Sequence, residues 1–381
     1  MSDSNHVRTE FRRQMPVTDK WAYFDHAAVS PLPQPSVDAL TAWARENSLE
    51  GDTVWPSWSK RLEEIRSLAA QLIGAKSSEI ALVHSTTEGI NLVAEGLPWL
   101  NGDNVVTLDN EFPSNQYPWL HQASRGVETR RVPTDDGRVN LDRLAAACDS
   151  RTRLVAVSWV GYLSGWRLDL NEVAELAHSR GALLFVDAIQ GLGVFPLDVR
   201  QTPIDFLAAD GHKWLLGPEG AGFFYLRAEH LDLLRPVGIG WNSVAHASDY
   251  SRIELRFKDT AARFEGGTPN MPGMIALGPS LELLLRFGTS QLASSVLENA
   301  DQACDRLRSI GAAIWSPHQD DHRSGIVSFE MPGRDSLSLR KHCWDHGVAL
   351  AHRSGKLRIS PHAYQNQDDI ERLIDVLSLA P

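Results

Sequence analysis

The stretch DFLAADGHKWLLGPEGAG, residues 205–222, places a lysine where a charged amine is costly. Lys213 follows an apolar segment that ends at Asp210 and precedes a Trp-Leu-Leu run that a Gly-Pro pair interrupts. One explanation is a lysine whose stem packs while its ammonium group reaches water. Another is burial that lowers the pKa of the amine, so that the neutral amine forms a Schiff base with a carbonyl. The stretch alone leaves both open.

Apolar runs of strand length alternate with segments of helical period around this lysine. The expected strands are residues 104–109, 153–160, 182–187, 204–210 and 221–227, with helices at 140–148 and 169–181. Such alternation predicts βαβ units and a mostly parallel sheet that is covered on both faces. Ligands bind beyond the carboxyl ends of such strands, so polar residues at strand ends become the candidate site residues.

The pattern changes after about residue 273. Helices at 274–288 and 290–311 precede short strands and a last helix that starts near Asp368. We therefore expect a large α/β domain at 22–272, and a small α+β domain built from 1–21 together with 273–381.

Composition limits the possible partners. A formal net charge of −11 argues against nucleic acid or an anionic membrane surface, and no apolar run has the length of a bilayer span. Three cysteines are too few for a disulfide framework, and the start of the sequence lacks the apolar segment of a signal peptide. These features favour a cytoplasmic protein without membrane contact.

Asp187 ends the expected strand 182–187 and is followed by Gln190 and two glycines. An aspartate here is often only a turn former. A buried carboxylate nevertheless needs a partner, and a protonated pyridine nitrogen would be one. Of the seven lysines, only Lys213 lies just past an expected buried strand. One strand-to-strand crossing would bring it to the same rim of the sheet as Asp187.

Two further segments have both a structural and a functional explanation. The run HSTTEGINLVAEGL, residues 84–97, contains a capping box that starts at Ser85, and a helix N-terminus also binds phosphate. The run RFEGGTPN, residues 263–270, is either an ordinary turn or a loop that offers Thr268 and backbone amides to an anion.

Aromatic and basic residues add further candidates. Phe112, in EFPSNQYPW, is either a core aromatic or a ring that stacks on a planar ligand. In HRSGKLRISPHAY, residues 352–364, Arg353 and Arg358 are either surface arginines or a fork for a carboxylate. Trp55, Trp58, Tyr162, Trp166 and Trp241 are either core aromatics or the walls of an aromatic substrate pocket.

Taken in order, these segments resemble the class V aminotransferase family of fold-type I pyridoxal-phosphate enzymes, above all its group II cysteine desulfurase and isopenicillin N epimerase-like branches. The motifs YFDHAAVSPLP, TTEGINLVAEG, VDAIQG, DGHKWLLGPEGAGFFY, RFEGGTPN and LRISPHAY carry the resemblance. It implies the fold-type I α/β fold, with a large mostly parallel-sheet domain and a small α+β domain.

The resemblance also implies roles for individual residues. Lys213 would form the internal aldimine with pyridoxal phosphate, Asp187 would bind the pyridine nitrogen, and Arg358 the substrate carboxylate. The implied cofactor-binding residues are Thr86, Thr87, Phe112, Asp187, Gln190, Asp210, His212, Lys213 and Thr268. The implied substrate-binding residues are Arg358, Arg353 and Tyr162, with no metal. Thr268 would reach the phosphate of a neighbouring subunit, which implies a homodimer with its active site at the interface.

The sequence departs from the desulfurase pattern where the catalytic cysteine is expected. Group II desulfurases carry that cysteine on a loop after an R-x-G element, whereas here Arg353-Ser354-Gly355 continues directly into Lys356. Cys343 lies upstream in an expected helix and is better interpreted as a core thiol. Tyr162 and Asp210 also replace an asparagine and a serine of the desulfurases. An ordinary desulfurase is therefore disfavoured.

These observations predict a pyridoxal-phosphate-dependent enzyme that acts at the α-carbon of an amino acid through Lys213. Epimerisation, β-elimination and transamination all remain open. One alternative is a C–S lyase of the cysteine desulfurase or selenocysteine lyase type despite the missing cysteine loop, and another is a non-catalytic relative that only binds the cofactor. A nicotinamide-dependent dehydrogenase is excluded because no G-x-G-x-x-G turn follows the first strand.

Overall fold

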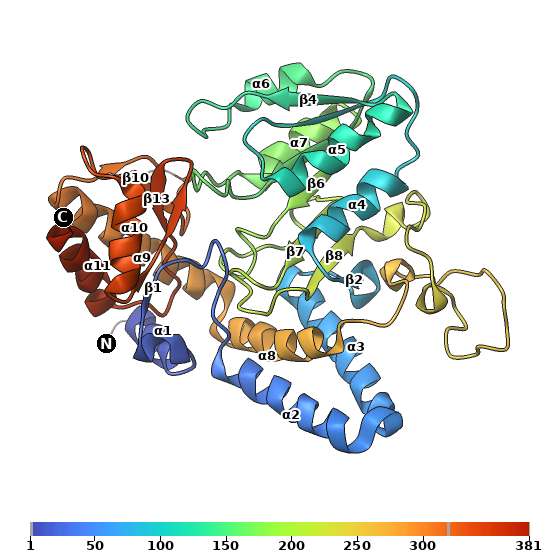
Figure 1. Cartoon of the computed structure of the whole chain (residues 1–381). Helices are drawn as coiled ribbons and strands as arrows, with labels where there is room; N and C mark the ends of the chain where they lie inside the picture. The colour runs from blue at the N-terminus through green and yellow to red at the C-terminus, as the bar shows by residue number, and fades with distance from the viewer. Residues whose placement is uncertain (1–2, 318–320, 381) are drawn as a thin grey trace.

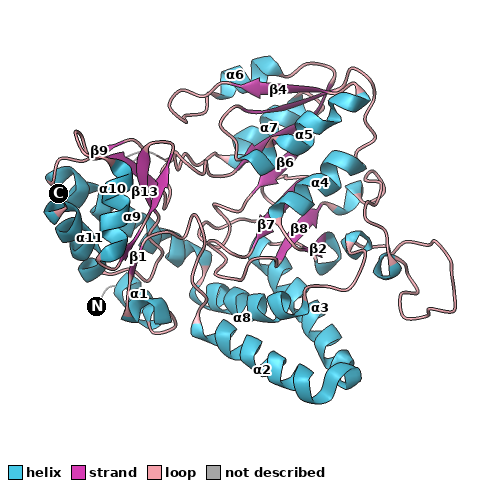
Figure 2. Ribbon diagram, viewed as in Figure 1, coloured by secondary structure: helices cyan, strands magenta, loops and turns pink. Residues whose placement is uncertain are grey.

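The computed structural model describes residues 3–317 and 321–380 (Figures 1 and 2). Its α-helices are α1 (Asp3–Arg12), α2 (Gln34–Glu50), α3 (Trp55–Ile73), α4 (Thr86–Gly96), α5 (Tyr117–His121), α6 (Leu141–Ala147), α7 (Leu170–Ser179), α8 (Met271–Phe287), α9 (Thr289–Ser309), α10 (Ser336–Asp345) and α11 (Gln367–Leu379). Its strands are β1 (Ala22–Tyr23), β2 (Ile80–Val83), β3 (Asn104–Leu108), β4 (Glu128–Val132), β5 (Thr152–Ser158), β6 (Leu183–Asp187), β7 (Phe206–Asp210), β8 (Gly222–Leu226), β9 (Ala313–Ile314), β10 (Val327–Glu330), β11 (Val348–Ala349), β12 (Ala351–Arg353) and β13 (Lys356–Ile359).

A seven-stranded sheet in the order β2-β8-β7-β6-β5-β3-β4 forms the centre of the larger part. Strands β7, β6, β5, β3 and β4 pair in parallel, and β8 is antiparallel to both of its neighbours. The predicted α/β fold with a mostly parallel sheet is thereby confirmed. Because β2 also runs in the parallel direction, the carboxyl ends of six strands lie along one edge.

Alternating side chains of these strands pack against helices on both faces. On β7, Leu207 and Ala209 belong to the apolar cluster that includes residues of α3, α7 and α8. Phe206 and Ala208 point the opposite way, into the cluster that includes residues of α4. The near-continuous apolar runs predicted from sequence therefore have a physical cause, since both faces of the sheet are buried.

All five strands predicted for this sheet are present, but β2 and β4 were missed. Strand β2 has only four residues, which is short for a recognisable pattern. Strand β4, with the sequence ETRRV, lies at the edge of the sheet and is largely exposed. Charged residues are common on edge strands because they discourage pairing with other chains. An apolar run was therefore the wrong signal for β4.

The C-terminal part contains an antiparallel sheet in the order β12-β13-β10-β9 and its own apolar cluster. Strand β1 pairs with β11, and Ala22 and Phe24 pack in this C-terminal cluster. Leu350 separates the short strands β11 and β12. The chain near residues 22–24 thus packs against the C-terminal part. The limits of the two domains stay a prediction. Within the described residues no helix combines the length and apolarity needed to cross a membrane.

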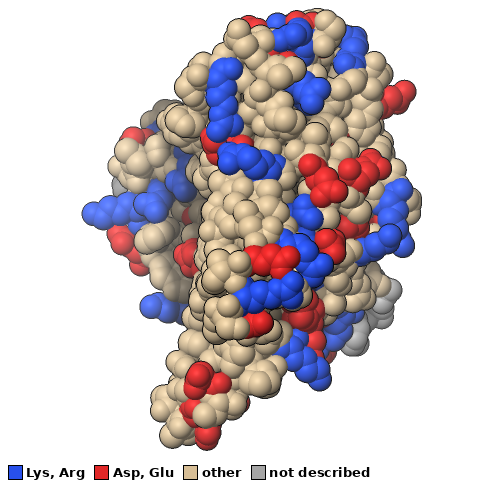
Figure 3. Space-filling model, turned by 90° about the vertical axis from the view of Figure 1, so that its right-hand side faces the viewer, with Lys and Arg blue, Asp and Glu red and all other residues tan. Residues whose placement is uncertain are grey.

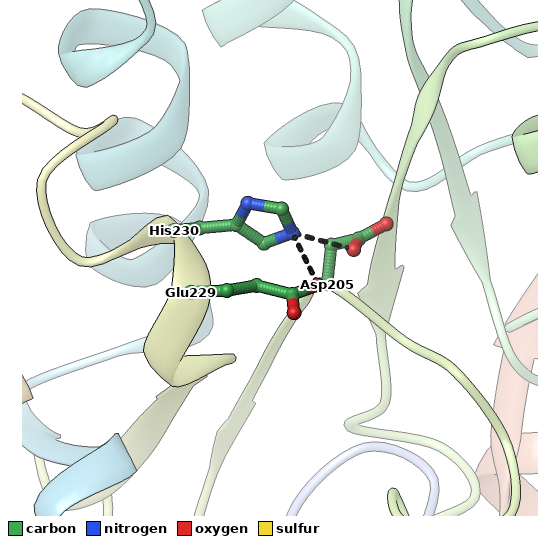
Figure 4. Close-up of side chains that lie close together, drawn as sticks. All are labelled: Asp205, Glu229 and His230. Atoms are coloured by element: carbon green, nitrogen blue, oxygen red, sulfur yellow. Dashed lines mark hydrogen bonds and ion pairs between the residues drawn. The ribbon is translucent and has the colours of Figure 1, made fainter.

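The edge of the sheet opposite the carboxyl ends holds a compact polar cluster around Asp205 (Figure 4). The Nε2 atoms of His178 and His230 lie 2.8 and 2.7 Å from the two Asp205 carboxylate oxygens. The backbone amide of Leu184 also donates to Asp205, at 2.7 Å. Glu229 lies beside His230, and Asp205, Glu229 and His230 are spaced closely enough to hold a metal ion. Hydrogen bonds within the chain already occupy the Asp205 carboxylate.

Candidate active site

A cavity of about 270 Å³ lies at the carboxyl edge of the sheet, next to the C-terminal part. Eleven of the twelve predicted site residues line it: Thr86, Thr87, Phe112, Tyr162, Asp187, Gln190, Asp210, His212, Lys213, Arg353 and Arg358. They come from the ends of different strands and from the β12–β13 hairpin. The rule that ligand sites form beyond the carboxyl ends of parallel strands therefore holds here.

Lys213 lies in the short loop after β7 and is buried. Burial lowers the pKa of its amine to about 8, against the opposing attraction of the Asp187 carboxylate. The loop turns back at Leu216, whose amide donates to the Lys213 carbonyl at 3.0 Å. Leu216 has a φ of 57°, a conformation that a side chain of this type rarely adopts. Such strain is maintained only where the surrounding packing fixes the chain, as it does next to this lysine.

Asp187 is the last residue of β6, and its buried carboxylate has few hydrogen-bond partners. Among the described residues its carboxylate accepts one hydrogen bond, from the Ile189 amide at 3.2 Å. Burial raises the pKa of this carboxyl to about 6, although the Ile189 amide and Lys213 lower it. A buried carboxylate with unused acceptor capacity is suited to a cationic or N–H-bearing ligand.

The start of α4 forms another part of the cavity lining. Ser85 caps the helix by accepting a hydrogen bond from the Glu88 amide, as predicted, whereas the Glu88 carboxylate accepts from the His84 amide instead of completing the capping box at Ser85. Thr86 and Thr87 form the first turn, where backbone N–H groups have no partner inside the helix. A helix N-terminus next to hydroxyl groups is suited to a phosphate.

Asp210 connects the start of α4 to the loop that carries Lys213. Its amide donates to Thr86 Oγ1 at 2.9 Å, and its carboxylate lies 2.9 Å from His212 Nδ1. His212 also lines the cavity, and its contact with Asp210 lacks hydrogen-bond geometry. Thr87 Oγ1 donates to Ser114 Oγ at 2.9 Å, which fixes the position of that hydroxyl.

Gln190 is held at both ends of its amide. Its Nε2 donates to the Ala27 carbonyl at 3.0 Å, and its Oε1 accepts from Trp214 Nε1 at 2.9 Å. One amide N–H remains for a ligand in the cavity. The buried Trp214, which the sequence presented only as part of an apolar run, therefore orients a predicted site residue.

Arg358 is only 1% exposed, which is rare for a guanidinium. Its Nη1 donates to the Tyr162 carbonyl at 2.6 Å, and its Nη2 lies 3.5 Å from Asp25 Oδ1 without hydrogen-bond geometry. Its Nε and Nη2 atoms have no hydrogen-bond acceptor among the described residues. Burial lowers the pKa of Arg358 to about 10, with Asp25 acting in the opposite direction. Spare donors on a buried cation are suited to a carboxylate.

Thr268 is the one predicted site residue outside the cavity, and it is exposed. The first glycine of the motif has a structural cause, because a Cβ atom at Gly266 would overlap the Gly238 carbonyl. The predicted aromatic pocket is wrong for four of its five residues, since only Tyr162 lines the cavity. Trp58, for example, packs in the core beside Trp43.

Three residues next to the site were missed by sequence reasoning: Asp25, Glu111 and Ser158. Ser158 ends β5, pairs with Asp187 and lines the cavity. The buried Glu111 accepts hydrogen bonds from the Ser158 amide and hydroxyl, and burial raises the pKa of its carboxyl to about 7. A polar residue at a strand end was the available signal for Ser158. Asp25 and Glu111 reach the site only through tertiary contacts.

All three cysteines lie outside the cavity and are buried. Burial raises the pKa of each thiol, to about 12 for Cys304 and Cys343. The hairpin after Arg353 has no room for a longer loop, because Arg353 pairs directly with Lys356 across a two-residue turn. Ser354 and Gly355 both have positive φ values, 47° and 80°, as a type I′ turn requires. The expectation that Cys343 is a core thiol agrees with this placement.

The residues of the cavity fit pyridoxal phosphate on chemical grounds. They combine an anion-binding helix start, a buried carboxylate with spare acceptors, an aromatic ring at Phe112, and a lysine with a lowered pKa. The Lys213 amine lies 5.6 Å from the centre of the Phe112 ring, which is 44% exposed. A planar cofactor with a phosphate, a basic ring nitrogen and an aldehyde uses each of these features.

Comparison with known proteins places these features in a family. The family model for Aminotransferase class-V matches residues 22–373. A protein of Methanothermobacter thermautotrophicus named as a probable cysteine desulfurase is 33% identical, with 97% of this chain and 98% of that protein covered.

Solved structures agree in fold. The apo structure of a cysteine desulfurase from Thermococcus onnurineus superposes with a TM-score of 0.88 at 28% identity, covering 97% of both chains. A cystine C–S lyase in complex with its product cysteine persulfide shares the fold, with a TM-score of 0.90 at 22% identity over 96% of this chain and all of that one.

Proposed function

Because the chain belongs to the aminotransferase class-V family of pyridoxal-phosphate-dependent enzymes, we propose that it removes the α-proton of a sulfur-containing amino acid and cleaves the bond between its β-carbon and sulfur. The observation that carries the proposal is one cavity that joins Lys213, Asp187 and Arg358 while every cysteine lies elsewhere. The reaction favoured is β-elimination of a sulfur group, a C–S lyase reaction. Relatives named as cysteine desulfurases support this over epimerisation or transamination.

The residues of the cavity divide into cofactor and substrate groups. The start of α4, with Thr86, Thr87 and the nearby His212, would hold the phosphate. Asp187 would accept a hydrogen bond from the protonated ring nitrogen, and the spare N–H of Gln190 would meet the ring hydroxyl. When bound, pyridoxal phosphate supplies an electron sink that is conjugated to the amino group of the substrate.

Arg358 and Lys213 would act on the substrate itself. The spare donors of Arg358 bind the α-carboxylate, and the Tyr162 carbonyl and Asp25 hold the guanidinium in place. Lys213, whose pKa of about 8 leaves part of the amine neutral near physiological pH, takes the proton from the α-carbon. Phe112 and Tyr162 both line the cavity and contact each other edge to face, with ring centroids 5.4 Å apart.

The bond changes balance without a protein thiol. The electrons of the Cα–H bond form the Cα–Cβ double bond, while the Cβ–S pair leaves with sulfur as a thiolate that takes up a proton. Addition of water to the remaining three-carbon fragment releases ammonium and pyruvate. A catalytic cysteine that accepts sulfur needs exposure and a low pKa. Neither condition holds for the three buried thiols of this chain.

A second copy of the chain is the proposed partner. Thr268 is exposed, and residues 239–255 include five exposed large apolar side chains: Ile239, Trp241, Tyr250, Ile253 and Leu255. The loop projects from the body of the molecule in Figure 1, and Figure 3 shows uncharged surface between scattered charges on that side. Apolar surface of this kind is typical of protein contacts.

The test of function is an assay of the purified holoenzyme with sulfur-containing amino acids. We expect equal amounts of pyruvate and ammonium, together with sulfide or a persulfide. The triple variant Cys148→Ala, Cys304→Ala, Cys343→Ala should retain this activity within about threefold, because no thiol takes part. Alanine as the carbon product, or loss of activity in a folded triple variant, would instead indicate sulfur transfer to the enzyme.

A mixing experiment with two weakly active variants tests whether the active site is shared between subunits. Lys213→Ala and Thr268→Ala homodimers are each expected to be weakly active. If Thr268 serves the site of its neighbour, a mixed dimer contains one site with both native residues. Unfolding and refolding the two variants together should then restore up to about a quarter of wild-type activity. The absence of any gain over the separate variants would show that Thr268 does not serve the site of its neighbour.

A further inference from the structure

The hairpin of β12 and β13 presents three basic side chains on one face. Cross-strand pairs join Arg353 to Lys356 and Ala351 to Arg358. Because side chains alternate along a strand, Arg353, Lys356 and Arg358 point the same way. Leu357 and Ile359 point the other way, into the C-terminal apolar cluster. The basic face therefore looks toward the cavity, which both arginines line.

Two of the three cations already have partners. Lys356 Nζ bonds to Glu330 Oε1 at 2.5 Å, on the neighbouring strand β10. Arg358 is held by the Tyr162 carbonyl and lies beside Asp25. Arg353, in contrast, has one hydrogen bond among the described residues, from Nη1 to the adjacent His352 carbonyl at 2.9 Å. It forms no ion pair with a described carboxylate, so its charge is unmatched at the mouth of the cavity.

The backbone under Arg353 is well fixed. The two-residue turn at Ser354 and Gly355 is too short to be flexible, and β13 is the inner strand between β12 and β10. Only the side chain of Arg353 extends into solvent. A guanidinium on a rigid support loses less freedom on binding than one on a mobile loop. Arg353 is therefore suited to bind a ligand, because β12 and β13 fix its backbone just as they fix the backbone of Arg358.

We propose that the substrate carries a second anionic group, on its side chain, and that Arg353 binds it. This inference rests on the proposed function, in which Arg358 takes the α-carboxylate. A guanidinium fork matches a group that presents two oxygens side by side, which a carboxylate or a sulfonate provides. The cofactor phosphate has a separate proposed site, at the start of α4.

The first test compares substrates with and without the second anion. L-cystine and S-sulfo-L-cysteine carry a carboxylate and a sulfonate respectively, on groups that leave as a persulfide and as thiosulfate, whereas S-methyl-L-cysteine carries neither anion. In Arg353→Gln, kcat/KM for the anionic substrate should fall about 10- to 100-fold, and for S-methyl-L-cysteine by less than about threefold. Arg353→Lys should recover part of the loss, and the two anionic substrates distinguish a carboxylate from a sulfur oxyanion.

A matched control lies on the same hairpin face. Lys356→Gln removes one positive charge from a residue that Glu330 already neutralises and that does not line the cavity. It should leave the preference between substrates unchanged. An equal fall for all substrates in Arg353→Gln, or an equal change of preference in Lys356→Gln, would overturn the proposal.

A binding test separates this inference from the proposed reaction. Calorimetry on the wild-type holoenzyme would compare succinate and glutarate with butyrate, which has a single carboxylate. We expect at least one of the two dicarboxylates to bind about 10-fold more tightly, and Arg353→Gln to abolish the difference. Equal affinities in the wild type would contradict the second anion. A clear difference in an enzyme that releases no sulfur would reject the C–S lyase reaction and retain the anion site.

Discussion

Two buried aspartates at opposite ends of neighbouring strands show how the same side chain serves structure or function. Asp205 precedes β7 on the edge away from the cavity, and it accepts hydrogen bonds from His230 (Figure 4), His178 and the Leu184 amide. Asp187 ends β6 at the cavity, and among the described residues it accepts only the hydrogen bond from the Ile189 amide. Both are almost fully buried. Only their partners differ.

The hydrogen-bond partners decide whether the pKa of each buried carboxyl is raised or lowered. At Asp205 burial raises the pKa of the carboxyl, but hydrogen bonds from His230, His178 and Leu184 outweigh it, so the pKa is lowered. At Asp187 burial dominates and the pKa rises to about 6. The chain thus satisfies one carboxylate completely and leaves the other for a ligand. A strained or poorly satisfied buried group is therefore a better sign of a functional site than burial alone.

The largest expected contrast is in activity. Asp187→Asn keeps the size of the side chain but removes the charge that would hold the ring nitrogen protonated, so kcat should fall about 10³-fold. Asp205→Asn should leave kcat of the folded enzyme within about threefold. Steady-state kinetics on the holoenzyme of both variants measures the difference. Similar losses in the two variants would remove the functional distinction between the two ends of the sheet.

A second contrast concerns stability. Asp205→Asn replaces a buried carboxylate that accepts hydrogen bonds from two histidines, and should lower the free energy of unfolding of the apoprotein by about 3–5 kcal/mol at pH 8. Urea denaturation followed by circular dichroism gives this value. A change below about 1 kcal/mol would mean that the Asp205 cluster does not stabilise the fold.

The Asp187→Asn substitution should instead raise the free energy of unfolding of the apoprotein. The pKa of Asp187 in the folded chain, about 6, lies above the unfolded value of 3.8, so folding favours its protonated form. The penalty for burying the ionised form is therefore absent below about pH 4, grows as the pH rises, and is complete above about pH 6. Removing it in Asp187→Asn should stabilise the apoprotein by up to about 3 kcal/mol at pH 8.

Denaturation of the Asp187→Asn apoprotein at pH 4 and at pH 8 separates this effect from altered packing. The gain over wild type should nearly disappear at the lower pH. A loss of stability at pH 8, or a gain that does not depend on pH, would contradict the account of Asp187 as an uncompensated charge.

The smallest expected effect is a shift in the titration of Lys213. Competitive acetylation of the apoprotein, followed by mass spectrometry, should give a pKa near 8 for this amine. Because the Asp187 carboxylate raises that pKa, Asp187→Asn should move the midpoint lower still. Asp205→Asn should leave it unchanged. A midpoint that stays near 8 in Asp187→Asn would show that the two groups do not interact.

The sequence predicted those site residues that follow from local pattern. Asp187 and Lys213 each follow an apolar strand, and parallel strands end at one edge, so their meeting at the cavity was predictable. Arg358 lies on a strand whose alternation separates it from its apolar neighbours. In each case one short segment of chain carried the whole signal.

What the sequence did not reveal depends on contacts between distant segments. Asp25 lies beside Arg358, and Trp214 orients Gln190, only after segments that are distant in the sequence have packed together. The aromatic pocket failed for a related reason, because large aromatic residues such as Trp58 fill the core between helices. Such residues become site residues or core residues through tertiary packing, which a linear pattern does not specify.

The most direct test of the central claim is the location of the cofactor bond. Borohydride reduction of the holoenzyme fixes pyridoxal phosphate to the lysine that holds it, and peptide mapping by mass spectrometry identifies that lysine among the seven in the chain. The account predicts modification of Lys213 alone, and none in Lys213→Ala. Modification at another lysine of the wild-type enzyme would contradict the assignment of the cavity as the active site.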